Sequence, residues 1–62
     1  MNIDELRAAV EAAEKAVNDA DYYYMQAFNK RGGDYRSAAH KQRITRANLK
    51  AARDALATAE AS

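Results

Sequence analysis

The chain of 62 residues contains no cysteine, no proline and no tryptophan, and only two glycines. Without cysteine there is no disulfide framework, and a single histidine leaves a structural zinc site short of ligands. Without proline, nothing interrupts a helix except the pair Gly32 and Gly33. No apolar run reaches the roughly 18 residues that a membrane-spanning helix needs. We therefore expect a small helical protein with neither covalent nor metal support.

Large apolar side chains are also scarce. Apolar residues make up 48% of the chain, but 16 of them are alanines. Alanine favours helix strongly and buries little area, so close approach of helices has to replace side-chain bulk. We expect residues 1–62 to form a single helical-hairpin domain with a thin core. Because such small domains are marginal alone, oligomerisation is the support that remains.

Charge is divided unevenly between the two halves. Residues 1–30 hold six acidic and three basic residues, a net charge of −3, and residues 31–62 hold seven basic and three acidic residues, a net charge of +4. The halves therefore attract each other, as an antiparallel pair of helices requires.

The first half follows a heptad pattern typical of a coiled-coil-like helix over about residues 3–31. Asn2 is suited to cap this helix, and Glu5 stands three residues later, at capping-box spacing. Lys30 and Arg31 suit the negative end of the helix. The predicted core positions are Ile3, Leu6, Val10, Ala13, Val17, Ala20, Tyr24 and Ala27.

The second half repeats the pattern over about residues 35–60, after a turn at 32–34 in which Asp34 is the expected cap. Its predicted core positions are Tyr35, Ala38, Gln42, Thr45, Leu49, Ala52, Leu56 and Ala59. Because the turn is so short, we predict an all-α, antiparallel two-helix hairpin.

The flanks of the hairpin predict its register. Folding about the glycines sets Ala20 near Thr45 and Tyr24 near Gln42, where a tyrosine hydroxyl could satisfy the amide. The same register brings together three pairs of opposite charge, namely Glu14 with Arg53, Asp21 with Arg46, and Arg7 with Glu60. Exposed pairs of this kind are worth about 0–1 kcal/mol each, so their main effect is to select the register.

A second apolar strip lies beside the core positions. We predict that it forms a homodimer interface, so that two hairpins make a four-helix bundle. The predicted interface residues are Ala9, Ala16, Tyr23, Ile44, Ala51 and Ala55. The alternative is that these alanines only favour helix formation on the surface of a monomer or a weak dimer.

All five aromatic residues fall within residues 22–35. Three successive tyrosines cannot share one face of a helix, so Tyr22 should be exposed, with Met25 nearby. Exposed tyrosine, methionine and arginine are common anchors for protein partners. The predicted partner-binding residues are Tyr22, Met25, Phe28, Arg36, His40 and Arg43. The alternative is that the rings, above all Tyr24, Phe28 and Tyr35, only fill the loop end of the hairpin.

The second half also carries a basic stripe, and no acidic residue occurs between Asp34 and Asp54. Such a stripe can follow phosphates, so nucleic acid is an alternative ligand. The possible contacts are Arg36, Arg43, Arg46, Lys50 and Arg53. The competing interpretation is that Asp21 and Glu14 occupy two of these arginines and leave the others as a solvated face.

Catalytic motifs are missing from the sequence. His40 is the only imidazole, and no carboxylate stands three or four residues from it. No set of nucleophile, base and orienting group is visible, and neither a cofactor nor a metal is indicated. We therefore expect a protein that is not an enzyme.

The most economical hypothesis is a small protein-interaction module, of the kind found among phage- and plasmid-type accessory and regulatory proteins, that binds or blocks a protein partner through a rigid helical surface. The alternatives are a nucleic-acid-binding bundle and a purely structural oligomerisation module. The first residues, Met1 to Glu5, contain no apolar segment typical of a signal peptide, so we expect a cytoplasmic protein without membrane contact.

Overall fold

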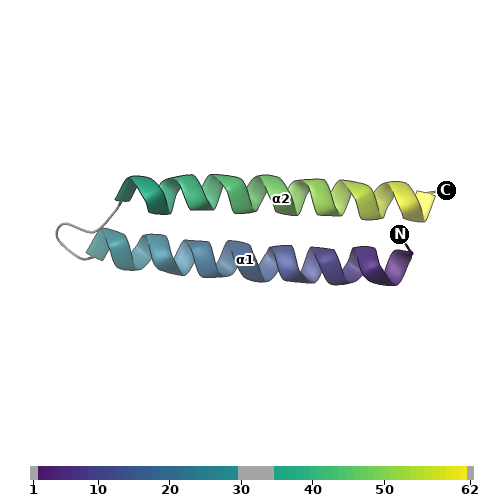
Figure 1. Cartoon of the computed structure of the whole chain (residues 1–62), viewed down its shortest axis with the longest axis horizontal. Helices are drawn as coiled ribbons and strands as arrows, with labels where there is room; N and C mark the ends of the chain where they lie inside the picture. Colours follow the sequence, from purple (N-terminus) through teal and green to yellow (C-terminus); the bar gives the residue numbers. More distant parts are fainter. Residues whose placement is uncertain (1, 30–34, 62) are drawn as a thin grey trace.

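The computed structural model describes residues 2–29 and 35–61 and confirms the helical hairpin. Helix α1 spans Ile3–Asn29 and helix α2 spans Tyr35–Ala61, each with 27 residues. The helices lie side by side and antiparallel, with both termini at one end (Figure 1). These two described ranges contain no strand. The predicted turn at 32–34, and the predicted roles of Lys30 and Arg31, lie outside the described residues.

The start of α1 is fixed by the expected cap. The backbone N–H of Glu5 donates to Asn2 Oδ1 at 2.8 Å, and the N–H of Leu6 donates to the Asn2 carbonyl oxygen at 3.1 Å. The bond from Glu5 satisfies one of the N–H groups that a helix start leaves without an intrahelical partner, and the bond from Leu6 is the first intrahelical bond of the helix. Asp4 and Glu5 add negative charge at the positive end of the helix dipole.

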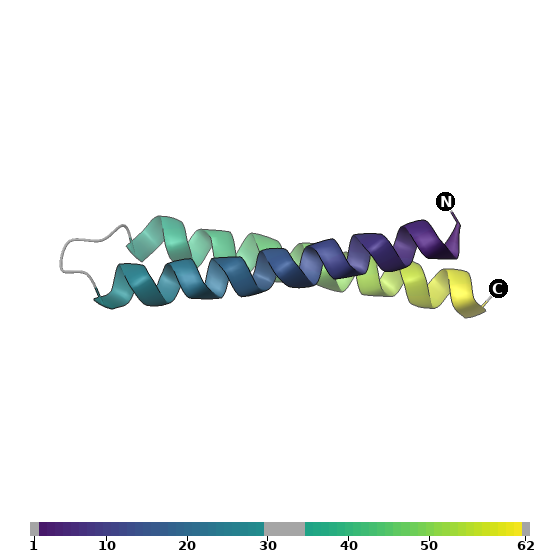
Figure 2. The ribbon, with the colours of Figure 1, turned by 90° about the horizontal axis from the view of Figure 1, so that it is seen from below.

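The hairpin is a thin rod. Its principal dimensions are 49 × 14 × 13 Å, and its radius of gyration is 14.3 Å. A compact domain of this length has a radius of gyration of about 11 Å. Viewed after a quarter turn, the two helices cross at a shallow angle near the middle of the rod (Figure 2). A shallow crossing is the geometry of helices that pack through heptad positions.

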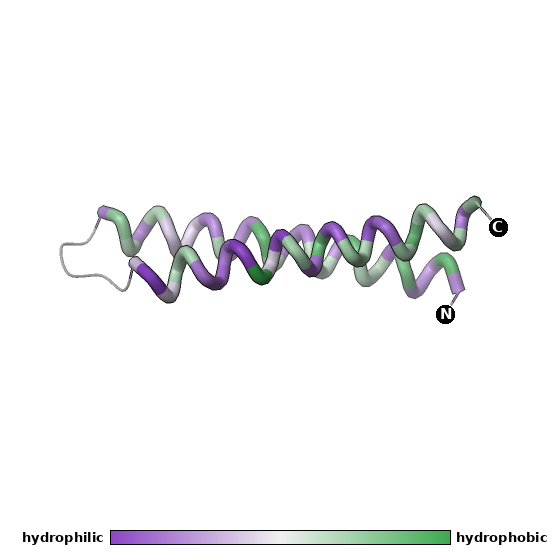
Figure 3. The backbone as a smooth tube through the Cα atoms, turned by 90° about the horizontal axis from the view of Figure 1, so that it is seen from above, coloured by the Kyte–Doolittle hydropathy of each residue, from purple (hydrophilic) through white to green (hydrophobic). Residues whose placement is uncertain are grey.

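The buried residues fall on the predicted core positions, and the hydropathy of the chain alternates along both helices accordingly (Figure 3). The most buried residues are Leu6, Val10, Ala20, Ala38 and Thr45. Ile3 and Tyr35, the first core positions of their helices, stay exposed because each lies at an end of the hairpin. None of the large side chains in the described residues is completely buried, so this core is thin.

The middle of the core is made of small side chains. Ala20 is completely buried, and Thr45, which the predicted register places opposite it, is nearly so. The Thr45 hydroxyl lies 2.9 Å from the carbonyl oxygen of Lys41 and 3.1 Å from that of Gln42, so it has acceptors within its own helix. A buried hydroxyl satisfied in this way needs no partner from α1.

Candidate protein-binding surface

One long face of the hairpin carries the predicted charge pairs. We call it the charged face, and it comprises Arg7, Glu14, Asp21, Arg46, Arg53 and Glu60. Arg7 Nη2 lies 3.5 Å from Glu60 Oε2, and Arg46 Nη2 lies 3.2 Å from Asp21 Oδ1. These two predicted pairs are confirmed, and they fix the antiparallel register at two points far apart along the rod.

Asp21 joins the two helices through a second bond as well. Gln42 Nε2 donates to Asp21 Oδ1 at 2.8 Å, beside the bond from Arg46. The prediction that Tyr24 would satisfy Gln42 is therefore wrong. A carboxylate is a stronger acceptor for an amide N–H than a neutral phenol, and Asp21 lies within reach of Gln42.

The remaining two charged residues of this face, Glu14 and Arg53, are not paired with each other. Among the ion pairs of residues 2–29 and 35–61 there is none between Glu14 and Arg53, so this predicted pair is not formed. Outside this face, Lys50 Nζ lies 3.0 Å from Asp54 Oδ2, one turn along the same helix. All these side chains are well exposed, so each pair contributes at most about 1 kcal/mol to folding.

The opposite long face contains the predicted dimer strip. Lys41 Nζ lies 5.5 Å from the centre of the Tyr23 ring, which shows that these two flanks face each other. Heptad steps lead from Tyr23 to Ala16 and Ala9, and from Lys41 to Asn48 and Ala55. The alanine face, as we call it, comprises Ala9, Ala16, Tyr23, Ile44, Ala51 and Ala55, and all six residues are exposed.

Three rings cluster where the hairpin approaches its loop. The ring of Tyr35 lies with its centre 5.1 Å from that of Tyr24 and 5.9 Å from that of Phe28. The Tyr24 hydroxyl donates to the Tyr35 hydroxyl oxygen at 2.8 Å. This hydrogen bond, with some desolvation and the nearby Tyr35 charge, raises the pKa of Tyr24. The ring contacts confirm that these aromatics join the helices at this end.

Much of the apolar surface at this end is nevertheless open to solvent. Tyr22 is 65% exposed, Met25 60% and Phe28 65%. Each step of three residues turns back by roughly 60° around a helix, so the three side chains form one band from the outer ridge of α1 to its contact with Tyr35. Gln26 Nε2 donates to the Tyr22 hydroxyl oxygen at 3.0 Å and orients that ring.

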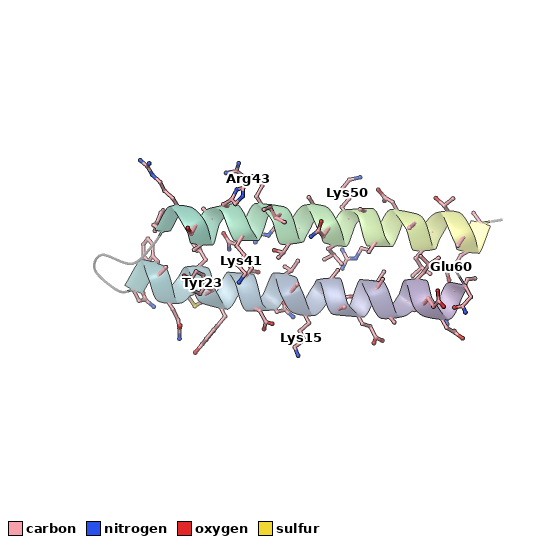
Figure 4. All side chains as sticks on the ribbon, viewed as in Figure 1. Lys15, Tyr23, Lys41, Arg43, Lys50 and Glu60 are labelled. Atoms are coloured by element: carbon pink, nitrogen blue, oxygen red, sulfur yellow. The ribbon has the colours of Figure 1, made fainter. Side chains whose placement is uncertain are left out.

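The basic residues of the predicted site form a second band, on α2. Arg36, His40 and Arg43 are all exposed and stand at helical spacings of four and three residues. Figure 4 shows the Arg43 side chain pointing away from α1. Within the described part of the chain, neither Arg36 nor Arg43 has an ion-pair partner.

The six predicted partner-binding residues thus lie on both helices in two bands, and Phe28 is the one of them that contacts the other helix, through Tyr35. Phe28 contacts Tyr35, and Tyr35 directly precedes Arg36. Tyr22 lies at the far end of the apolar band, on the back of α1. We call the six residues the tip surface: Tyr22, Met25, Phe28, Arg36, His40 and Arg43.

The predicted nucleic-acid contacts are only partly available. Arg46 is bonded to Asp21, and Lys50 is paired with Asp54. Lys50, like Arg43, points away from α1 (Figure 4). Two of the five cations in the stripe therefore have an acidic neighbour, which lowers the positive potential that a phosphate backbone would meet.

Among the residues that the structure describes, no three histidine, cysteine or acidic side chains cluster as metal ligands would. The described helices include none that is long and apolar enough to cross a membrane. No family model, curated protein or solved structure matches the chain.

The contacts that sequence reasoning missed include two between the helices, Gln42 with Asp21 and Lys41 with Tyr23. A signal for the second was present, because position 23 and position 41 lie on matching flanks in the predicted register. The first had no such signal, since a glutamine amide can reach several acceptors from one core position.

Proposed function

We propose that this protein is a non-enzymatic interaction module that binds a protein partner through the tip surface, in the manner of phage- and plasmid-type accessory proteins. The observation that carries the proposal is the band of Tyr22, Met25 and Phe28, three large apolar side chains that are each at least 60% exposed. A soluble surface has no need to keep three such residues contiguous, and contiguous exposed apolar residues mark interaction sites.

The charges beside this band define the partner. Arg36 and Arg43 lie on the neighbouring helix, in its half nearer the loop, with guanidinium groups that have no ion-pair partner in the described structure. Arginine forms bidentate bonds to carboxylates, and complementary charge raises association rates and selects partners. The matching ligand is a protein segment with one or two large apolar residues next to aspartate or glutamate.

We also propose that two hairpins associate into a homodimeric four-helix bundle, as the sequence predicts. Tyr23 and Ile44 on the alanine face are 45% and 46% exposed, which is high for residues on the flank of a core. Covering them with a second hairpin would bury both, and a thin two-helix core gains most from such burial.

Peptide selection tests the tip surface without knowledge of the natural partner. Random peptides displayed on phage are selected against the immobilised protein. We expect enrichment of sequences in which acidic residues flank leucine, phenylalanine or tryptophan. The selected peptides should lose at least tenfold in affinity for Phe28→Ala and for Arg36→Glu. Peptides that bind both variants as well as the unchanged protein would contradict the proposal.

Two matched controls separate the tip surface from general effects. Lys15→Glu repeats the charge reversal on the back of α1, where Lys15 points away from α2 (Figure 4), and should leave binding unchanged. Ala57→Glu places a charge on an exposed part of α2 near the termini and should also bind normally. Equal loss in all variants would point to misfolding and contradict a local binding surface.

Nucleic acid remains a second candidate because of the cations on α2. A mobility-shift assay at low salt tests it, with binding expected to weaken steeply as salt rises. The ion pairs of Arg46 and Lys50 favour the protein partner over this alternative.

A further inference from the structure

We infer that two copies pair through the alanine face in opposite directions, so that the loops and tip surfaces lie at the two ends of the bundle. This inference rests on the proposed homodimer and adds its geometry. Three features support it: the exposed area of the chain, the positions of the large side chains of the alanine face, and the position of Asn48.

The exposed area matches what a dimer needs. The chain exposes 4900 Å². A compact monomer of this mass exposes about 4000 Å², which leaves an excess of about 900 Å². A stable interface of standard size takes about 800 Å² from each partner. The excess surface of the elongated hairpin is therefore large enough for an ordinary dimer interface.

The large side chains of this face are unevenly placed along the rod. Tyr23 and Ile44 lie in the half near the loop, whereas Ala9, Ala51 and Ala55 lie toward the termini. If the copies paired with their loops at the same end, Tyr23 would meet the second copy's Ile44, and alanine would meet alanine at the other end. Helix separation depends on the side chains at the contact, so that arrangement would be wedge-shaped and poorly packed.

The opposite orientation pairs large with small. A two-fold axis through the middle of the rod passes near Ala16 of α1 and Asn48 of α2, the midpoints of the two helices. It sets Tyr23 over the second copy's Ala9. It also sets Ile44 between the second copy's Ala51 and Ala55, as a knob enters a hole. The spacing between helices is then even along the bundle.

Asn48 adds a polar reason for the same orientation. In the opposite orientation it meets its own counterpart on the two-fold axis, where two amides can bond to each other. With loops together it would instead face alanine. A single asparagine at a core position is a known means of fixing helix register and orientation. Loops together would bring Asp19 near the second copy's Lys41, but an exposed pair is worth only about 0–1 kcal/mol.

The functional consequence is a bivalent binder. With the hairpins opposed, the two tip surfaces lie at opposite ends of a rod whose long dimension is 49 Å. Each bundle can hold two partner segments at once, and two sites on one assembly raise avidity without any new contact.

Engineered cysteines test the orientation directly, because the chain has no thiol of its own. Under mild oxidation, Ala16→Cys is expected to form a covalent dimer, since the two thiols meet at the axis. Ala9→Cys alone should stay uncrosslinked but should couple with Tyr23→Cys when the two variants are mixed. Ala8→Cys, its neighbour on the outer ridge, is the control and should not couple.

Two coupling results would contradict the opposed orientation of the hairpins. Coupling of Ala9→Cys with Ala55→Cys, and none for Ala16→Cys, would place the loops together and overturn the inference. No coupling for any variant of the alanine face would overturn it as well. These cysteines lie outside the tip surface, so a failure here leaves the peptide-selection test of the proposed function intact.

Discussion

The charged face and the alanine face flank the same core, yet they stabilise the molecule in different ways. On the charged face, Arg7 pairs with Glu60 and Asp21 with Arg46, so both helices are tied in register while water remains in contact. On the alanine face, the one cross-helix contact identified in the described structure is Lys41 over Tyr23. Register is thus set on one side of the rod, and apolar area stays exposed on the other.

This difference has a simple physical basis. Ion pairs between exposed side chains discriminate among registers but add little free energy. Burial of apolar area stabilises the folded state, but it distinguishes poorly between alternative registers when most of the buried side chains are alanine. A hairpin that uses a separate face for each task can be correctly aligned as a monomer and acquire its stability as a dimer.

The largest effect is expected from a charge placed on the alanine face. Ile44→Glu should abolish dimer formation, because an unpaired carboxylate at a buried interface costs several kcal/mol, roughly 3–5. The measurement is the thermal midpoint by circular dichroism at a series of protein concentrations. The unchanged protein should melt higher as concentration rises, and the variant should not.

Ala57→Glu is the matched control for this variant, since it adds the same charge to an exposed part of α2 outside both the alanine face and the tip surface. It should keep the concentration dependence of the unchanged protein. A concentration-dependent midpoint in Ile44→Glu would show that the alanine face is not the interface.

The next effect concerns the core that both faces share. Ala20→Leu should lower the free energy of unfolding by about 1–3 kcal/mol, because Ala20 is completely buried and extra methylenes force the helices apart. Urea denaturation measures the change. Ala8→Leu, the same substitution on the exposed outer ridge, should shift stability by no more than about 0.5 kcal/mol. Equal stability of the two variants would contradict close packing at Ala20.

A smaller effect is expected on the charged face, where paired and unpaired acids can be compared. Asp21→Asn removes the partner of Arg46 and weakens the bond from Gln42. We expect a loss of about 0.5–1 kcal/mol, discounted for the exposure of these groups. Glu14→Gln, which breaks no ion pair in the described structure, should cost close to nothing.

Added salt makes this comparison sharper. The difference between Asp21→Asn and Glu14→Gln should shrink at high ionic strength, because exposed pairs are screened. A difference that does not respond to salt would mean that hydrogen bonding by Asp21, and not its charge, sets the register.

The smallest effect lies at the loop end of the rod. Hydrogen bonding raises the pKa of Tyr24 above the ordinary value of 10.0 in the folded state. Its contribution to stability is therefore complete below the ordinary pKa and is lost as pH rises through the raised one. Titration of tyrosinate absorbance should show a late-ionising component that Tyr24→Phe removes and Tyr22→Phe retains.

Much of the fold was predictable because heptad spacing fixes backbone positions. The core positions from Leu6 to Ala59, the Asn2 cap and the pairs at Asp21 and Arg7 all follow from spacing and register. The partners that long side chains contact could not be predicted from spacing and register. Lys50 forms an ion pair with Asp54 of its own helix, and Gln42 donates a hydrogen bond to Asp21. Each of these long side chains can reach several acceptors from one backbone position.

The exposure of the tip surface could also be predicted in part from the sequence. Spacing alone required Tyr22 and Met25 to face solvent, and both do. The high exposure of Phe28 and Tyr35 could not be read from spacing, because it depends on where the helices end near the loop.

The most direct test of the central claim, that a second copy covers the alanine face, is sedimentation equilibrium of the unchanged protein over a wide range of concentrations. We expect a mass of twice the 6.9 kDa of one chain. A mass of 6.9 kDa at every concentration, from a protein that is helical and melts cooperatively, would contradict it.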